Sequence, residues 1–374
     1  MKNKKLLIFT EYFLPGYKAG GPIRSIYNLA KILSEKYDVY VVAKDRDIGE
    51  SKPYDDIQTD TVLDYEEFQI YYISDITKSA IHNIISDINP DTIYINSTYS
   101  KTSQIILYLN KLNLIQKKLV LAPRGELQPN ALQIKSFKKK VYMFFTKMTN
   151  FYDGVVFHST DKTETINIKK QIKTDNIFEI SNISMPTQKY APLIKDKNQL
   201  NIIFLSRIRD NKNLIFALNV IKDFNFDITF GIYGPIEDED YWKRCQKIIE
   251  ALPKNIKCKY YGSVKPENIA PTMRKYHCLL LPTMTENFGH VIAEAMFTGV
   301  IPIISDQTPW LSLEEKQAGW DISLKNKNEY KKVIEKLYNM EEDNYQKLSK
   351  NTMLYVEKKL NLEKMKNAYI KLFK

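Results

Sequence analysis

The chain is poor in cysteine and histidine and lacks any long hydrophobic run. It has 3 cysteines and 4 histidines among 374 residues, and neither type shows the spacing of metal ligands. The odd number of cysteines (Cys245, Cys258 and Cys278) indicates buried thiols in a reducing compartment rather than a disulfide framework. No apolar run approaches the ~20 residues of a membrane span. These absences argue against a disulfide-rich secreted domain, a membrane-spanning protein and a protein-bound catalytic metal, and they predict a cytoplasmic location.

Acidic residues are also in deficit, since the formal net charge is +11. Between Gln128 and Tyr152 there are five lysines and no acid, and apolar residues from Val141 to Phe145 lie among them. A basic amphipathic helix of this kind can rest on an anionic surface, which would make the protein peripheral at the inner face of the cell membrane. The alternative is a core-facing apolar stripe with solvated lysines. No helix-turn-helix, zinc spacing or RNP-like motif supports nucleic-acid binding.

Short apolar runs alternate with helical stretches throughout, which favours parallel sheets with crossover helices. Strands are predicted at Leu6–Thr10, Val39–Ala43, Gln69–Ile73, Thr92–Ile95, Leu119–Ala122, Gly154–Phe157, Ile177–Ile180, Leu200–Leu205, Ile228–Tyr233, Lys257–Tyr261, Cys278–Leu281 and Ile301–Ser305. Helices are predicted at Pro22–Ser34, Ser79–Asp87, Thr102–Leu112, Ser136–Met148, Lys162–Ile172, Val291–Phe297 and Asp343–Leu372. The length suits two α/β domains, each with its own core.

The most informative stretch follows the predicted strand Cys278–Leu281. Glu286 and Glu294 stand eight residues apart across a glycine-containing turn that opens a helix. A strand, a turn and a helix N-terminus form an anion site, because free backbone N–H groups and the helix dipole favour negative charge. Two carboxylates on either side of such a site suit a nucleotide sugar, which has sugar hydroxyls at both ends. The alternative is two solvated glutamates on an ordinary α/β crossover.

This stretch resembles the donor site of glycosyltransferase family 4, whose members are retaining enzymes of the GT-B fold. In that family the first Glu of E-x7-E contacts the donor sugar and the second contacts the nucleotide ribose. The resemblance implies these roles for Glu286 and Glu294, and it places the turn Asn287, Phe288 and Gly289 against the diphosphate. It also implies two doubly wound Rossmann-like domains, an acceptor-side domain at 1–185 and a donor domain at 186–350. A C-terminal helix at 351–374 would pack back on the first domain.

Arg207 and Lys212 follow the first strand of the second half and enter a helix. Cations near a helix N-terminus can neutralise a diphosphate leaving group, whereas the simpler interpretation is a solvated basic turn. Their spacing matches the donor-diphosphate Arg and Lys of the family. The resemblance therefore implies that Arg207 and Lys212 are catalytic together with Glu286.

Two further loops carry glycines that resemble donor-site glycines of the family. Gly20 and Gly21 allow close approach of backbone to a ligand, and the family has a glycine-rich loop at this place. Gly262 and Val264 resemble its loop near the nucleobase. The alternatives are a plain loop-to-helix turn and a strand-to-loop glycine.

Three polar residues in the first half are assigned to the sugar or acceptor side. Arg124 and Glu126 follow a predicted strand, in a loop where many family members carry a histidine that this chain lacks. His158 ends another strand, shortly before a helix for which Thr160 is a candidate N-cap. The alternative for the Arg124–Glu126 loop is a structural turn.

Two D-x-D triplets, Asp45-Arg46-Asp47 and Asp238-Glu239-Asp240, need a separate interpretation. Such a triplet after a strand can hold a divalent metal, as in GT-A transferases. An acidic loop or an acidic first helical turn explains it as well, because the helix dipole favours acids there. We favour the second interpretation and predict no metal site.

The resemblance implies a retaining, metal-independent glycosyltransferase of the hexosyltransferase type, without a cofactor. Its donor would be a nucleotide diphosphate sugar, with UDP-sugars favoured, and its acceptor a glycan or lipid-linked glycan of bacterial surface polysaccharide, such as capsule or O-antigen. The alternatives are a metal-dependent GT-A-like transferase and a nucleotide-sugar-binding protein without transferase activity. Manganese dependence would indicate the first, and donor binding without turnover would indicate the second.

Overall fold

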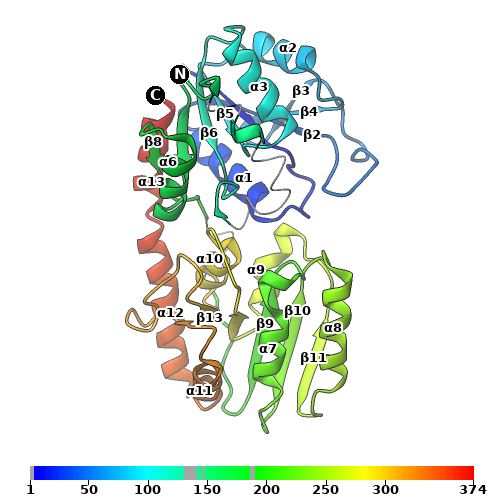
Figure 1. Ribbon diagram of the computed structural model, residues 1–374. Helices are drawn as coiled ribbons and strands as arrows, with labels where there is room; N and C mark the ends of the chain where they lie inside the picture. The colour runs from blue at the N-terminus through cyan, green and yellow to red at the C-terminus, as the bar shows by residue number, and fades with distance from the viewer. Residues whose placement is uncertain (1–3, 130–140, 145, 147, 186–189) are drawn as a thin grey trace. The chain divides into compact units, whose positions relative to one another are not determined.

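The structure is a computed structural model that describes residues 4–129, 141–144, 146, 148–185 and 190–374 (Figure 1). The chain divides into two compact units. Unit 1 runs to Ile183 and takes up Leu362–Lys374 again, and unit 2 comprises Ser184–Asn361. Each unit contains one sheet with crossover helices, which confirms the predicted pair of Rossmann-like sheets. Within these residues no helix combines the length and apolar character that crossing a bilayer requires.

Unit 1 is built on eight described strands in the order β3-β4-β2-β1-β5-β6-β7-β8. They are β1 (Lys5–Phe9), β2 (Asp38–Lys44), β3 (Val62–Tyr65), β4 (Phe68–Ile73), β5 (Thr92–Asn96), β6 (Lys118–Ala122), β7 (Val156–Ser159) and β8 (Ile177–Glu179). The pairs are parallel except β3 with β4. β5 is buried at every position, as expected for a central parallel strand with helices on both faces.

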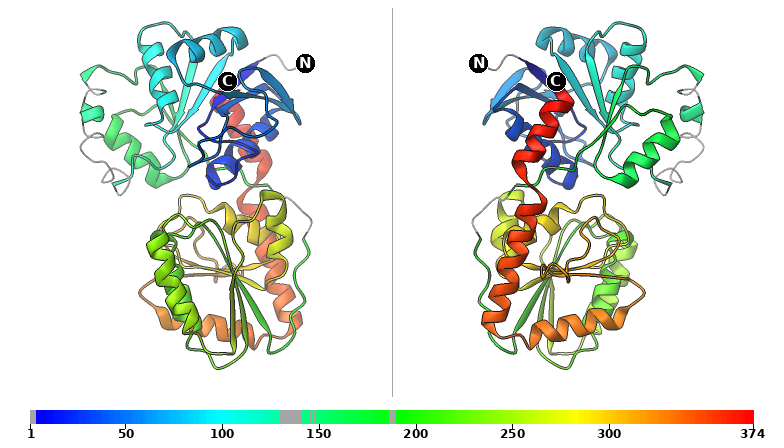
Figure 2. Two further views of the ribbon diagram at one scale, coloured as in Figure 1. Left: turned by 90° about the vertical axis from the view of Figure 1, so that its right-hand side faces the viewer. Right: turned by 90° about the vertical axis from the view of Figure 1, so that its left-hand side faces the viewer.

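The helices of unit 1 include one from the C-terminus of the chain. They are α1 (Gly21–Leu33), α2 (Lys78–Ile88), α3 (Lys101–Lys111), α6 (Lys162–Ile172) and α13 (Leu362–Phe373). α13 packs against α1, where the hydroxyl of Tyr37 donates to the carbonyl of Ile370 (Figure 2). The Oγ1 of Thr92 donates to the carbonyl of Phe373 at 3.1 Å. The last helix is therefore an integral part of unit 1.

Unit 2 contains six described strands, all parallel, in the order β11-β10-β9-β12-β13-β14. They are β9 (Leu200–Leu205), β10 (Ile228–Tyr233), β11 (Ile256–Tyr260), β12 (Cys278–Leu281), β13 (Ile301–Ser305) and β14 (Trp320–Ile322). From β9 the sheet grows in one direction through β10 and β11, and from β12 it grows in the other through β13 and β14. Loops that leave β9 and β12 therefore diverge to opposite faces, and the sheet has a topological switch point between these strands.

Two groups of helices cover this sheet. They are α7 (Leu214–Ile221), α8 (Glu239–Glu250), α9 (Ile269–Met273), α10 (His290–Phe297), α11 (Lys327–Tyr338) and α12 (Glu342–Lys359), with short 3-10 turns η1 (Asp210–Lys212) and η2 (Pro266–Asn268). α7 packs with α8 and α11, whereas α10 packs with α9 and α12 (Figure 1). The apolar run of β12 is fully buried between these layers.

The C-terminal prediction needs a correction. One continuous helix was expected from Asp343 to Leu372, but α12 ends at Lys359 and α13 begins at Leu362. α12 belongs to unit 2, and the part of the chain that rejoins unit 1 begins at Leu362 rather than at 351. The division between the units at Ile183 lies two residues before the predicted limit of 185.

Gly234 directly follows β10 and lies against the backbone of Ser206, which directly follows β9. Its φ is +131°, and a Cβ there would lie 1.9 Å from the carbonyl oxygen of Ser206. Because backbone rather than a flexible side chain blocks the space, we expect Gly234→Ala to lower the free energy of unfolding by about 3 kcal/mol or more. Thermal and urea denaturation would measure this.

The matched control is Gly262→Ala. Gly262 also has a positive φ, +79°, but a Cβ there would meet nothing within 4 Å. Backbone strain alone should then cost about 1 kcal/mol. Equal losses for the two variants would mean that the close approach to Ser206 is not what requires Gly234.

Candidate functional site

The segment that follows β12 is hydrogen-bonded to the segments that follow β9 and β13. The amide of Met284 and the Oγ1 of Thr283 both donate to the carbonyl of Asn211 in η1, at 2.8 and 3.0 Å. The amide of Glu286 donates to the carbonyl of Gln307 at 3.1 Å. The turn after β12 is thus held against both the segment after β9 and the end of β13.

Lys212 and Glu286 meet at this place. The Nζ of Lys212 lies 2.5 Å from an Oε of Glu286, and the two side chains are only 8% and 17% exposed. One residue follows β9 and the other follows β12, so the ion pair lies at the switch point of the sheet, where open parallel sheets bind their ligands. The structure therefore brings into direct contact two residues that the resemblance assigned to one site.

Gly289 shapes the turn that carries Glu286. It is the N-cap of α10 with φ +75°, and a Cβ there would lie 3.0 Å from the Cγ of Glu286 and 2.8 Å from Ile292. Glycine thus allows both the left-handed backbone and the position of the carboxylate. The preceding Phe288 is buried, and its carbonyl accepts from the indole N–H of Trp310 at 2.5 Å. Asn287 completes the turn.

Glu294 lies within α10, one turn beyond His290, and is 9% exposed. Its position in the helix that begins at the switch point agrees with the predicted placement. It is separated along the chain from the Lys212–Glu286 pair by the turn at Gly289.

Arg207 is held by a partner that the sequence analysis missed. The Nη1 of Arg207 lies 2.8 Å from one carboxylate oxygen of Glu237, and the Nη1 of Arg209 lies 3.3 Å from the other. Glu237 follows β10, and an isolated parallel bridge between Ile208 and Ile236 brings the two loops together. Only the structure reveals this pairing, because thirty residues separate Arg207 from Glu237.

The loop with Gly262 and Val264 follows β11 at the same edge of the sheet. The carbonyl of Gly262 accepts from the amide of Gly234 at 2.8 Å. Next to it, Tyr261 is 47% exposed and stacks on Tyr233, with ring centroids 4.8 Å apart and planes within 8°. Val264 is partly buried. All predicted donor residues of unit 2 thus follow carboxyl ends of strands or lie in α10.

In unit 1, Gly20 and Gly21 begin α1, and Gly20 adopts φ +68° as its N-cap. The preceding loop is anchored by Asp47, which accepts from the amides of Tyr17 at 2.8 Å and Lys18 at 3.1 Å. One member of the first D-x-D triplet therefore serves a structural purpose.

Asp45 and Asp238 of these triplets also have structural partners. Asp45 pairs with Arg46 at 2.7 Å, and Asp238 is the N-cap of α8, where it accepts from the amide of Tyr241 at 2.8 Å. The first triplet lies in a loop, and Glu239 and Asp240 of the second lie in the first turn of α8, as the second interpretation expects. Within the described residues, no group of three or more acidic, histidine or cysteine side chains is arranged to hold a metal ion.

Arg124 and His158 belong to one buried network. Arg124 donates to Asn96 and to the hydroxyl of Tyr94, both at 2.9 Å, and also to Asn182. Tyr94 in turn lies 2.7 Å from the Nδ1 of His158, whose Nε2 lies 2.8 Å from the carbonyl of Ile180. Since that carbonyl can only accept, Nε2 carries the proton and Nδ1 accepts from Tyr94.

His158 therefore has no nitrogen left for an acceptor substrate. It is fully buried, and burial, together with the positive charge of Arg124, lowers its pKa to about 3. The neutral ring that this pKa implies matches the bonding pattern. The prediction that His158 faces the sugar or acceptor is corrected: it is a core residue of unit 1.

Glu126 braces the loop between β5 and α3. Its carboxylate accepts from the amides of Thr98 and Tyr99 and from the Oγ of Ser97 at 2.7 Å. The neighbouring amide of Gly125 donates to buried Glu164 at 2.6 Å. These contacts fit the structural turn that was the alternative for this loop. Asp161, rather than Thr160, is the N-cap of α6.

The lysine-rich segment between Gln128 and Tyr152 lies largely outside the described residues, including Lys135, Lys138, Lys139, Lys140 and Lys147. Residues 141–144, 146 and 148 of the predicted helix Ser136–Met148 are described and are helical. Contact of this segment with an anionic membrane surface stays a prediction.

Comparisons with known proteins bear on the family and the fold of the chain. The sequence model of the family described as "Glycosyl transferases group 1" matches residues 187–354, all within unit 2. An uncharacterized 41.2 kDa protein in the cps region of Klebsiella pneumoniae is 24% identical over 252 residues, which cover 65% of this chain and 67% of that protein.

Two solved structures match along nearly the whole chain. Sucrose-phosphate synthase from Thermosynechococcus elongatus aligns with a TM-score of 0.75 and 13% identity, covering 99% of this chain and 98% of that one. The Anabaena protein HepE, solved in complex with UDP and glucose, aligns with a TM-score of 0.69 and 13% identity, covering 99% of each. The fold is GT-B, as predicted, rather than GT-A. Together the comparisons support a glycosyltransferase.

Proposed function

We propose that the chain is a retaining glycosyltransferase of family 4. It would transfer a sugar from a nucleotide diphosphate sugar, with UDP-sugars favoured, to a hydroxyl of a glycan or lipid-linked glycan. The observation that carries this proposal is the Lys212–Glu286 ion pair at the switch point of unit 2. A lysine for a diphosphate and a carboxylate for sugar hydroxyls stand side by side there, at the edge where an open parallel sheet binds ligands.

The chemistry assigns a separate task to each residue. As the bond between the anomeric carbon and the diphosphate oxygen breaks, negative charge grows on the leaving group. Lys212 and Arg207 would stabilise that charge with the amides at the start of α10. Glu286 would orient the sugar, and Glu294 would bind the ribose. Donor binding would require Lys212 to exchange its present partner, Glu286, for a phosphate oxygen.

The acceptor hydroxyl would attack the anomeric carbon from the face that the diphosphate leaves. A new bond to the acceptor oxygen forms there, and the acceptor proton passes to an oxygen of the departing diphosphate. The resemblance to family 4 implies this route, which needs no dedicated protein base. The burial of His158 and the bonded carboxylates of Glu126 and Glu164 fit such a route, because none of these groups is placed as a base.

The proposed pathway is the synthesis of a bacterial surface polysaccharide. It rests on the likeness to a Klebsiella protein that its printed name places in a cps region. The glycan or lipid-linked acceptor and the choice between capsule and O-antigen belong to the same proposal.

A panel of nucleotide sugars, scored by the thermal unfolding of the full chain, tests this function. A ligand that binds only the folded state stabilises it by about 2.7 kcal/mol at a hundredfold excess over Kd. We expect one UDP-sugar to raise the melting temperature more than GDP- or dTDP-sugars do. Transfer to a glycan acceptor, with the anomeric configuration read by NMR, would establish retention. A panel without any stabilising nucleotide sugar would contradict the proposal.

Transfer should continue in the presence of EDTA. Lys212 and Arg207 supply the positive charge at the diphosphate, while Asp45, Asp47 and Asp238 are engaged in structural contacts. We expect initial rates with and without chelator to agree within about twofold, since no step of the proposed chemistry uses a metal ion to neutralise the diphosphate. Loss of most activity, restored by manganese or magnesium, would be the opposite result.

A further inference from the structure

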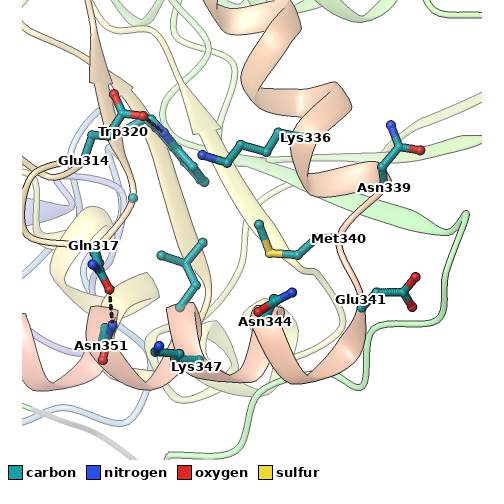
Figure 3. A pocket seen from close by; sticks show the side chains of 12 residues that line it. Glu314, Gln317, Trp320, Lys336, Asn339, Met340, Glu341, Asn344, Lys347 and Asn351 are labelled. Carbon is teal, nitrogen blue, oxygen red and sulfur yellow. Dashed lines mark hydrogen bonds between the residues drawn. The ribbon is translucent and has the colours of Figure 1, made fainter.

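A pocket lies in unit 2 at the sheet edge opposite to the candidate donor residues. It has a volume of about 480 Å³ and is bordered by the residue that begins β14, the end of α11 and the first half of α12 (Figure 3). Because all strands of this sheet are parallel, the start of β14 is at the amino edge. Lys212 and Glu286 follow the carboxyl ends of β9 and β12. The pocket is therefore separate from the donor residues.

One wall of the pocket is apolar. Met340 and Leu348, which are partly buried, contribute it together with Trp320, which is only 4% exposed and whose indole N–H donates to Glu314 at 3.0 Å. The Nζ of Lys336 lies 5.4 Å from the centroid of the Trp320 ring, and Figure 3 shows this side chain pointing toward the ring. A long exposed lysine can move aside without disturbing the fold.

The rest of the lining is rich in side-chain amides. Asn339, Asn344, Asn351 and Gln317 border the pocket, and the Nδ2 of Asn351 donates to the Oε1 of Gln317 at 3.2 Å (Figure 3). An amide both donates and accepts, as a sugar hydroxyl does. The charged side chains of the lining are two lysines and two glutamates, so their net charge is zero. A phosphate or a polycation would gain little from such a lining.

We infer that this pocket binds a neutral segment of a glycan, one or two sugar rings long, with a ring face against the apolar wall. The volume lies in the range of small-ligand sites. An apolar wall beside a rim of amides matches a ligand that has apolar C–H faces and hydroxyls around its edge. Contact of that ligand with the largely buried indole requires Lys336 to move off the ring.

Such a site would act on the proposed reaction through avidity. A long acceptor held at the amino edge reaches the transfer site at a raised effective concentration, even if each contact is weak. Only this consequence rests on the proposed function; binding of the glycan does not.

Fluorine NMR of the full chain labelled with 5-fluorotryptophan tests the binding. The chain has three tryptophans, Trp242, Trp310 and Trp320, and therefore three fluorine resonances. The resonance that disappears in the Trp320→Phe variant is that of Trp320. We expect maltoheptaose or N-acetylchitotetraose to shift the Trp320 resonance saturably at millimolar concentration. UDP should instead shift Trp310, which contacts Phe288 in the candidate donor site. No saturable shift of Trp320 with either sugar, or a shift with pyrophosphate or a peptide mixture instead, would overturn the inference.

Asn344→Ala should weaken glycan binding by about fivefold or more, the effect of one lost hydrogen bond. Asn344 is exposed on α12, so the variant should fold, and Asn328→Ala, exposed on α11 outside the pocket, is the matched control. Unchanged binding in Asn344→Ala would contradict the inference. With transfer measured, Asn344→Ala should raise KM for long acceptors and leave short ones unaffected. Glycan binding without any transfer would refute the proposed function and leave this site standing.

Discussion

Replacing Glu286 with alanine is expected to lower kcat by about 10²-fold or more, the effect of losing a charged hydrogen bond of roughly 3 kcal/mol. The carboxylate would contact the transferring sugar, whose geometry changes as the bond breaks, so its loss should act on the transition state. The affinity for free nucleotide diphosphate should be unchanged or slightly tighter. That ligand has no sugar, and Lys212 would no longer have to leave Glu286 to reach it.

Glu294→Ala should behave in the opposite way. Its carboxylate would contact the ribose, which is remote from the chemistry, so both the donor and the free nucleotide should bind more weakly. Calorimetry with free UDP and steady-state kinetics with the donor separate the two effects. Glu286→Gln keeps the shape of the side chain and controls for altered packing. If Glu286→Ala loses nucleotide affinity while Glu294→Ala retains it, the assigned roles are wrong.

The sequence predicted four of the six described strands of unit 2 with their observed bounds, because the residues of these four satisfy one requirement. β9, β10, β12 and β13 have the predicted bounds, since parallel strands covered on both faces need uninterrupted apolar runs. Two edge strands escaped prediction. β3 is short and has only exposed and partly buried residues, and β14 is three residues long. The break between α12 and α13 was missed as well, since Leu360 and Asn361 include neither glycine nor proline.

The sequence predicted those residues of the candidate site that belong to a local motif. It did not predict contacts between residues that are far apart in the chain. Lys212 and Glu286 were each predicted for a ligand, but their contact across 74 residues depends on the order of β9 and β12. Glu237 directly precedes the acidic triplet Asp238-Glu239-Asp240, and nothing in the local sequence distinguishes it as a partner of Arg207. His158 and Asp47 are polar residues that the fold uses as internal partners, and a local sequence pattern does not distinguish those from ligand contacts.

The Lys212–Glu286 pair should also be coupled energetically in the absence of ligand. Both side chains are largely removed from water, so removing one partner leaves a partly buried charge without compensation. Lys212→Ala and Glu286→Ala should each lower the free energy of unfolding by about 2–3 kcal/mol. The double variant should lose less than the sum, with a coupling energy of about 2 kcal/mol in a double-mutant cycle. Chemical denaturation of the four proteins measures it.

An exposed pair supplies the control, and kinetics supplies the link to function. Lys243 and Asp240 lie 3.1 Å apart but are 66% and 91% exposed, so the same cycle there should give a coupling close to zero. Lys212→Ala should in addition lower kcat by about 10³-fold, because the leaving diphosphate loses its fixed cation. Unlike Glu286→Ala, it should also weaken the binding of free nucleotide diphosphate. Lys212→Arg keeps the charge and should recover part of both effects. If the losses in unfolding free energy of the two single variants add up to the loss of the double variant, the contact between Lys212 and Glu286 contributes nothing in solution. The exchange of partners proposed for donor binding would then have no energetic basis.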